Sequence, residues 1–338
     1  MRTLVFLEAG RLEWQEAPDA ALETADDALV RPLAVAACDL DVALLRGLTP
    51  FQGPFPIGHE FVGEVAAVGS AVTGFAPGDR VIVPFQIGCG ACACCASGRT
   101  GSCQTVPPVS MYGFEPLGGR WGGALADLVR VPFASHMLVR LPAGLDPAAV
   151  ASVSDNVADG WRAVGPPLAE YPGARVLVLG GIGSVPLYAV ACAVAAGAAR
   201  VDYVDPDGAR AAVAEALGAQ VSRRPSSARE TYPITVDGSN DPRGLRRALQ
   251  SLEPEGICTS VSIYFGGDVP LPLLAMYTRG VRFVTGRVNS RAALPRVLEL
   301  IARGGLRPER VTSEIVPWDR AAEALAQPSL KPIVVRGA

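Results

Sequence analysis

Apolar runs alternate with helix-length segments in the middle of the chain. Arg175–Leu179 and Arg200–Val204 are apolar runs of strand length. Each precedes a segment rich in alanine, Ser184–Ala196 and Asp207–Leu217, which a glycine follows directly. Glycine just after the last turn is a common helix end, so both segments are predicted to be helices. Strands and helices in alternation are typical of βαβ units around a parallel sheet.

The same pattern continues towards the C-terminus. Further strands are predicted at Ile234–Asp237, Ile257–Ile263 and Arg282–Thr285, with a helix at Arg243–Ser251. A last helix (Arg291–Ala302) and a closing strand (Pro332–Val335) follow. The second half of the chain is therefore predicted to be an α/β domain with a parallel sheet.

Residues 1–150 have a different pattern, in which glycine and proline interrupt short apolar runs. Phe61–Val68 and Asp79–Pro84 are examples. Short β-rich runs at regular spacing indicate a barrel-like all-β domain. With 338 residues, of which 49% are hydrophobic, the chain is long enough for two cores.

Charge and cysteine content exclude several classes of function. The net charge of −3 and the absence of a long Lys/Arg run argue against a nucleic-acid partner. No signal-peptide pattern begins at Met1, and no apolar stretch of about 18 residues is free of charges and turn formers. Crowded cysteines in a reducing compartment favour metal over disulfides. We therefore expect a cytoplasmic protein without a membrane partner.

Four cysteines with short spacing form the strongest local signal. Cys89, Cys92, Cys95 and Cys103 follow the pattern Cys-x2-Cys-x2-Cys-x7-Cys. Four thiolates complete the tetrahedral coordination of zinc, at about 2.3 Å per Zn–S bond. A closed site of this kind is structural. The neighbouring Cys94 is expected to point away, although an arrangement with Cys94 in place of Cys95 is the alternative.

A second set of metal-binding side chains is spread along the chain. Cys38, the pair His59-Glu60 and Asp155 are far apart in sequence, and His59 is one of two histidines. Glycines at 58 and 63 flank the pair within apolar strands, a setting that presents side chains into a cleft. Three protein ligands with one open position are typical of catalytic zinc.

A glycine turn follows the first strand of the predicted parallel sheet. Gly181 and Gly183 allow a pyrophosphate to approach a helix N-terminus, and Ser184 and Val185 are expected to contact the cofactor there. Proline stands at position 186, where a third glycine is usual. Asp205 ends the second strand, and an acid at that position binds ribose hydroxyls and repels a 2′-phosphate. Residues 206–208 supply no arginine, so NAD is expected rather than NADP.

These motifs together resemble the zinc-dependent alcohol dehydrogenases of the medium-chain dehydrogenase/reductase superfamily. The resemblance implies a GroES-like β-barrel catalytic domain at 1–155 with a zinc lobe at 89–103. A Rossmann domain with a doubly wound parallel sheet follows at 156–287, and residues 288–338 return to the catalytic domain. It also implies hydride transfer between an alcohol, or its aldehyde or ketone, and NAD. The expected assembly is a homodimer or homotetramer.

The resemblance also implies roles for single residues. Cys38, His59 and Asp155 would bind the catalytic zinc, the second of two per chain, with Glu60 beside it. Asp41 would orient the histidine ligand. Two further sets follow: Leu40 and Phe85 at the substrate pocket, and Lys331 at the cofactor phosphates. Leu40 occupies a position at which a hydroxyl usually passes the substrate proton outward, so the usual proton relay is not expected here.

Two other functions fit the same fold. One is a reductase of the quinone or enoyl type without catalytic zinc. The other is a non-catalytic nucleotide-binding protein that keeps only the structural zinc. The presence of Cys38, His59 and Asp155 argues against the first.

Overall fold

The structure is a computed structural model that describes residues 1–223 and 230–337. The chain divides into two compact units. The first comprises residues 1–156, 289–295 and 312–338, and the second residues 157–288 and 296–311. Within the described residues no helix is long and apolar enough to cross a membrane.

The first unit is built on an antiparallel sheet. Its strands run in the order β15-β16-β3-β5-β6-β8, with β7 paired to β3, and β15 is parallel to β16. Their bounds are β3 (Ala28–Ala36), β5 (Glu60–Val68), β6 (Arg80–Val83), β7 (Val129–Val131), β8 (Val139–Arg140), β15 (Glu314–Pro317) and β16 (Pro332–Val335). A separate sheet, β2-β1-β4, consists of β1 (Arg2–Glu8), β2 (Arg11–Glu16) and β4 (Phe55–Pro56). These sheets agree with the β-rich pattern of the first 150 residues.

Short helices connect these strands. They are α1 (Asp39–Leu45), α2 (Ala93–Ala96), α3 (Glu115–Gly118), α4 (Ala134–Met137) and α11 (Ala321–Leu325). Among the described residues, the 3₁₀ turns of this unit are η1 (Thr100–Ser102), η2 (Ala151–Ser154) and η4 (Trp318–Arg320), and η3 (Pro308–Val311) belongs to the second unit. Of these elements, α1 begins directly after the predicted metal ligand Cys38, and η2 ends directly before the predicted ligand Asp155.

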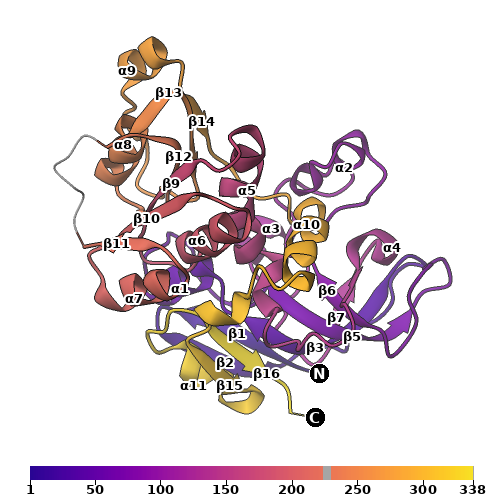
Figure 1. The fold of residues 1–338 in the computed structure, drawn as a ribbon. Helices are drawn as coiled ribbons and strands as arrows, with labels where there is room; N and C mark the ends of the chain where they lie inside the picture. Colours follow the sequence, from indigo (N-terminus) through magenta and orange to yellow (C-terminus); the bar gives the residue numbers. More distant parts are fainter. Residues whose placement is uncertain (224–229, 338) are drawn as a thin grey trace. The chain divides into compact units, whose positions relative to one another are not determined.

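The second unit contains the predicted parallel sheet. All its strands are parallel, in the order β11-β10-β9-β12-β13-β14. The strands are β9 (Arg175–Leu179), β10 (Arg200–Val204), β11 (Gln220–Ser222), β12 (Tyr232–Asp237), β13 (Leu252–Ser260) and β14 (Arg282–Val284). The helices are α5 (Asn156–Glu170), α6 (Val185–Ala195), α7 (Gly208–Ala216), α8 (Pro242–Gln250), α9 (Leu273–Arg279) and α10 (Ser290–Ala302). The division of the chain into units falls within α5 and α10, which Figure 1 labels.

Buried residues on both faces explain why this sheet forms. Leu177 and Leu179 of β9 pack with Leu245 and Leu249 of α8 in one apolar cluster. Val176 and Val178, which alternate with the two leucines, are also fully buried. A strand buried on both faces is typical of a doubly wound sheet. The predicted α/β domain is therefore confirmed.

Glycines end the two predicted helices as expected. Gly197 and Gly218 follow α6 and α7 with φ of 84° and 106°, in the left-handed region. At the other end of α7, Asp207 caps the helix by accepting a hydrogen bond from the backbone N–H of Arg210. Residues 296–311 lie with the second unit and not with the first, because η3 contacts α6 and Arg310 donates to the carbonyl of Ala216.

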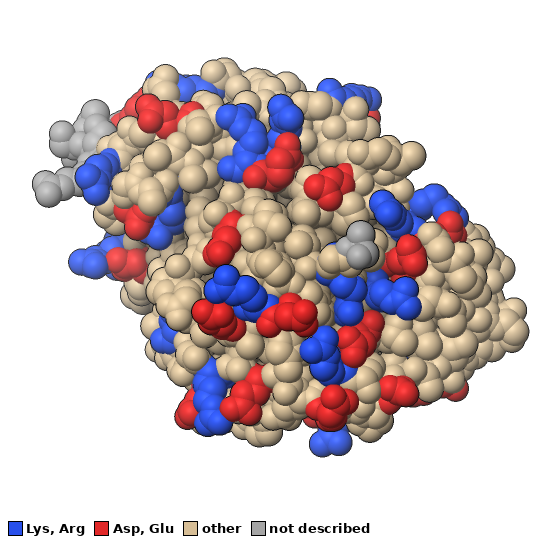
Figure 2. Space-filling view, turned by 90° about the horizontal axis from the view of Figure 1, so that it is seen from below, with Lys and Arg blue, Asp and Glu red and all other residues tan. Residues whose placement is uncertain are grey.

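Charges of both signs are interspersed on the face drawn in Figure 2. Exposed ion pairs of the structure, such as Arg320–Glu323 and Arg11–Glu13, join neighbouring opposite charges. Exposed pairs of this kind contribute little to stability. The energy of folding therefore comes mainly from the buried apolar residues of the two units.

The glycine turn is packed against the end of β12. A Cβ atom on Gly181 would lie 2.1 Å from the carbonyl oxygen of Gly238. A Cβ atom on Gly238 would in turn lie 2.2 Å from Cγ of Pro186. The proline in place of the third motif glycine is thus accommodated by a glycine on the neighbouring strand end.

We expect Gly181→Ala to destabilise the protein by about 1–3 kcal/mol, because the new methyl group meets backbone that cannot move freely. Thermal unfolding followed by circular dichroism measures this. Gly266→Ala is the matched control, since its Cβ would have nothing within 4 Å. Equal melting temperatures for the two variants would contradict the packing argument.

Candidate metal and cofactor sites

Three ends of secondary structure meet at the candidate catalytic centre. Cys38 caps the N-terminus of α1 just after β3, and His59 directly precedes β5. The two strands pair antiparallel with Ala36 opposite Glu60, which brings Cys38 and His59 together. Asp155 lies between η2 and α5. All three side chains belong to the first unit.

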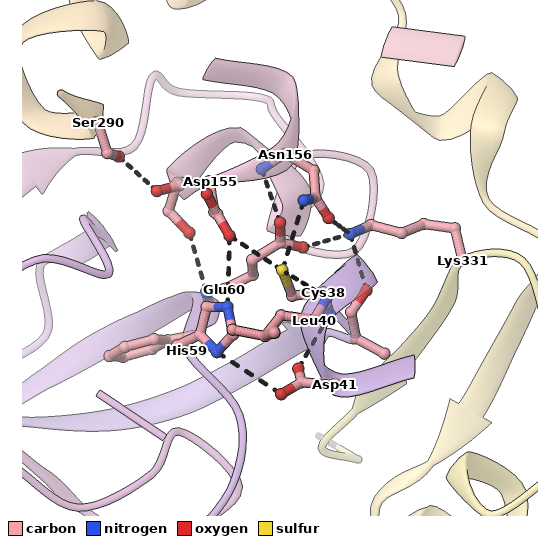
Figure 3. Close-up of polar contacts among 12 residues, drawn as sticks. Cys38, Leu40, Asp41, His59, Glu60, Asp155, Asn156, Ser290 and Lys331 are labelled. Atoms are coloured by element: carbon pink, nitrogen blue, oxygen red, sulfur yellow. Dashed lines mark hydrogen bonds and ion pairs between the residues drawn. The ribbon is translucent and has the colours of Figure 1, made fainter. Parts of the chain in front are cut away.

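The ligand atoms of these three residues converge (Figure 3). Cys38 Sγ is 3.1 Å from Asp155 Oδ2, and His59 Nε2 is 3.3 Å from the same oxygen. All three ligand atoms lie within 4.8 Å of one another, and all three residues are buried. A thiolate, an imidazole nitrogen and a carboxylate are ligands that zinc accepts. In their metal-binding forms they are all electron-pair donors, so a cation is needed to hold them together.

The orientation of His59 also fits a metal. Nδ1 faces Asp41 Oδ1 at 3.7 Å, and within the part of the chain that the structure describes neither buried atom has a hydrogen-bond partner. The other oxygen of Asp41 accepts the backbone N–H of Cys38. A small shift of the imidazole would let Nδ1–H donate to Asp41 and leave Nε2 as the ligand atom, which is the usual support of a metal-bound histidine.

Burial and neighbouring charges shift the pKa values at this centre. Burial raises the pKa of Cys38, and the carboxylate of Asp155 adds to the effect. Burial by itself lowers the pKa of His59, but the carboxylates of Asp41 and Asp155 outweigh it and raise the pKa to about 9. A divalent cation among these groups would favour the thiolate and the neutral imidazole instead. The donor set therefore fits zinc.

Glu60 lies directly behind the three ligands. Its carboxylate accepts a hydrogen bond from the backbone N–H of Asn156 at 2.7 Å and pairs with the ammonium of Lys331. Burial, reinforced by Asp155, raises the pKa of Glu60 to about 8 although Lys331 opposes the shift. Both Glu60 and Lys331 are completely buried.

Lys331 lies beside Glu60 at the candidate centre. Its Nζ donates to the carbonyl of Ala37 at 2.8 Å, to Glu60 and to Asn156 Oδ1. An ammonium has three protons. Three acceptors surround the fully buried Nζ, and Lys331 is the counter-charge of Glu60. Its contact with the cofactor phosphates stays a prediction.

Two apolar residues border the same centre. The ring of Phe85 lies 5.6 Å from that of His59, and Phe85 is buried. Leu40 is the second residue of α1, and its backbone N–H donates to Cys38 Sγ at 3.4 Å. Their contact with a substrate stays a prediction.

The four lobe cysteines also come together. The sulfur atoms of Cys89, Cys92, Cys95 and Cys103 lie within 4.8 Å of one another, and Cys94 does not belong to this cluster. Backbone N–H groups of Gln104 and Cys95 donate to the sulfur of Cys92 and lower its pKa to about 6. N–H donors of this kind stabilise thiolates, which are the form that binds zinc.

At the cofactor turn, the structure adds a residue that sequence reasoning missed. Asp205 is fully buried and accepts hydrogen bonds from the hydroxyl of Tyr203 and the backbone N–H of Asp207. Arg210 also binds it, with Nε and one terminal nitrogen on different carboxylate oxygens at 2.7 and 2.9 Å. Residues 206–208 contain no arginine, but the first turn of α7 carries Arg210. Ser184 and Val185 are buried at the start of α6.

Comparison with known proteins gives the family. The alcohol dehydrogenase GroES-like domain matches residues 24–143. An alcohol dehydrogenase of Cupriavidus necator is 30% identical over 298 residues, covering 81% of this chain and 80% of the relative. A probable zinc-binding alcohol dehydrogenase of Mycobacterium tuberculosis is 29% identical, covering 96% of this chain and 85% of the relative. The solved structure of alcohol dehydrogenase TADH from Thermus sp. ATN1 superposes with a TM-score of 0.90 at 30% identity, and each chain is covered completely.

The chain belongs to the zinc-dependent alcohol dehydrogenases. This family is part of the medium-chain dehydrogenase/reductase superfamily, and its GroES-like domain and Rossmann domain are the fold predicted from the sequence. The protein is therefore a zinc-dependent oxidoreductase that acts on alcohols. A reductase without catalytic zinc and a non-catalytic nucleotide-binding protein are not favoured.

The lobe of this alcohol dehydrogenase homologue gives the first metal prediction. Cys92→Ser should lower the zinc content by one ion per chain, because one of four ligands is lost. Cys94→Ser should leave the zinc content unchanged. Metal analysis of the two purified variants makes the comparison, and equal losses would refute the assignment of Cys92 and Cys94.

Proposed function

We propose that the protein oxidises an alcohol, or reduces the corresponding aldehyde or ketone, with NAD at the Cys38–His59–Asp155 centre. The observation that carries this proposal is the close approach of Cys38 Sγ and His59 Nε2 to one oxygen of Asp155. A zinc ion held by these residues would act as a Lewis acid on the substrate oxygen. A second zinc in the lobe would be structural.

The residues around the centre have separable tasks in this proposal. Asp41 orients His59, while Phe85 and Leu40 provide apolar surface that keeps water from the reacting atoms. Glu60 has one oxygen bound by the backbone of Asn156 and the other by Lys331. Both oxygens of this carboxylate are therefore already hydrogen-bonded. Since Leu40 has no hydroxyl, the substrate proton is proposed to leave through solvent.

The test of this function is an activity assay with a panel of alcohols and NAD, in which the absorbance of NADH measures turnover. We expect Asp155→Ala to reduce turnover at least about a hundredfold, since a catalytic metal contributes several kcal/mol to the transition state. The same variant should lose one zinc per chain but retain the zinc of the lobe. Cys94→Ser is the matched control and should keep its activity. Full turnover in Asp155→Ala would overturn the proposal.

NAD is proposed as the cofactor rather than NADP. The support is the buried carboxylate of Asp205 at the end of β10, where a 2′-phosphate would meet negative charge. Arg210 binds both oxygens of this carboxylate. Asp205 is therefore fixed in position, and Arg210 is at the same time prevented from serving a phosphate.

We expect Asp205→Ser to favour NADP over NAD by at least tenfold relative to the wild type, or about 1.4 kcal/mol. The reason is that the substitution removes a negative charge and releases Arg210. The ratio of kcat/KM for the two cofactors is the measurement. Asp207→Asn, which keeps a helix cap two residues away, is the control. A wild type that already prefers NADP tenfold would contradict the proposal.

A homodimer or homotetramer is proposed as the assembly. The support is an apolar surface on α9 next to the edge of the parallel sheet. Leu273, Leu274 and Tyr277 are 65%, 77% and 85% exposed, and α9 has no buried residue. Large exposed apolar side chains that cluster in this way usually mark a protein interface. We propose that a second copy of the chain binds this surface.

A cytoplasmic location of the protein stays a prediction.

A further inference from the structure

Asn156 connects the candidate metal ligands with the buried ion pair behind them. It follows Asp155 and is the first residue of α5, with 2% of its surface exposed. Its side-chain Nδ2 lies 3.5 Å from Cys38 Sγ, and its Oδ1 accepts a hydrogen bond from Lys331. Its backbone N–H donates to Glu60 Oε1. Figure 3 shows the amide between the sulfur and the ammonium.

The chemistry of these partners fixes the orientation of the amide. An ammonium is only a donor, so the amide oxygen must face Lys331. The NH₂ group must then face Cys38. A flipped amide would place two donors against each other at Lys331 and an oxygen against the sulfur. The N–H···S hydrogen bond therefore follows from the position of Lys331.

Cys38 Sγ thus receives two N–H donors. One is the side chain of Asn156, and the other is the backbone N–H of Leu40 at 3.4 Å. Hydrogen bonds to a ligating sulfur withdraw negative charge from it and hold it in one direction. The positive charge of Lys331 on the amide oxygen polarises Asn156 and strengthens its donor end.

We propose that Asn156 is a positioning residue that sets the direction and the charge of the Cys38 thiolate towards the metal, with Lys331 as its anchor. This inference rests on the proposed metal site at Cys38, His59 and Asp155. In this proposal Lys331 has two roles. Its ammonium pairs with Glu60, and it also polarises the amide of Asn156, which donates to the sulfur of Cys38.

Cobalt in place of zinc makes the thiolate visible. A Co²⁺–thiolate centre has a charge-transfer absorption that depends on the charge of the sulfur, and the difference from Cys38→Ser isolates the contribution of this sulfur from that of the lobe. With Asn156→Leu, the absorption should move to longer wavelength, because an unbonded sulfur gives up its electrons more easily. The metal affinity of this variant, measured by competition with a chelator, should be about 10–100-fold lower than that of the wild type.

Two further variants keep the test decisive. Asn156→Asp has the same size and can still face Lys331 but presents an oxygen to the sulfur, so it should show the same loss of metal affinity even if Asn156→Leu fails to fold. Ser154→Ala is the control, because the hydroxyl of Ser154 accepts a hydrogen bond from the backbone N–H of Phe61 and, among the described residues, makes none with Cys38. Its spectrum should match the wild type.

The outcomes separate the two proposals. An unchanged spectrum and unchanged metal affinity in the folded Asn156 variants would overturn the role of Asn156 and leave the metal site intact. A wild type whose cobalt spectrum does not change on Cys38→Ser would overturn the metal site itself, and with it the inference.

Discussion

The buried ion pair between Lys331 and Glu60 holds the candidate centre together. The two residues are 271 positions apart in sequence, and neither has any exposed surface. Antiparallel pairing of β16 with β3 brings Lys331 next to Ala37, and the pairing of β3 with β5 places Glu60 on the other side. Removing one partner of a buried pair typically costs about 3–5 kcal/mol, because the other charge is left without compensation. The segment that leads into the C-terminal strand β16 is therefore part of the centre.

This ion pair also explains how so many acidic groups share one small volume. Asp41, Glu60 and Asp155 are buried around Cys38 and His59. A carboxylate in such surroundings tends to take up a proton and lose its charge. The ammonium of Lys331 supplies part of the opposing charge. A divalent cation bound by the donor set would supply the rest. The centre is thus arranged for a charge that the polypeptide alone does not carry.

Local patterns predicted much of the fold and little of the contact network. The order of strand and helix from Arg175 to Leu217 and the cysteine spacing in the lobe are properties of neighbouring residues, so the sequence was sufficient for both. The contact of Asn156 with Cys38 depends on how η2 lies against β3, which no local pattern encodes. The same holds for Lys331, whose position in a motif suggested a phosphate contact, and for Gly238, whose missing side chain makes room for Pro186.

The close packing of the lobe sulfurs affects how readily they are oxidised. Backbone N–H donors lower the pKa of Cys92, and its sulfur lies 4.0 Å from that of Cys103. A thiolate beside a second thiol is the arrangement that oxidants convert most readily into a disulfide. Zinc in the lobe would protect these sulfurs from that reaction. Once zinc is lost under oxidative stress, a disulfide in the lobe would prevent zinc from binding again. A reductant would first have to restore the thiols.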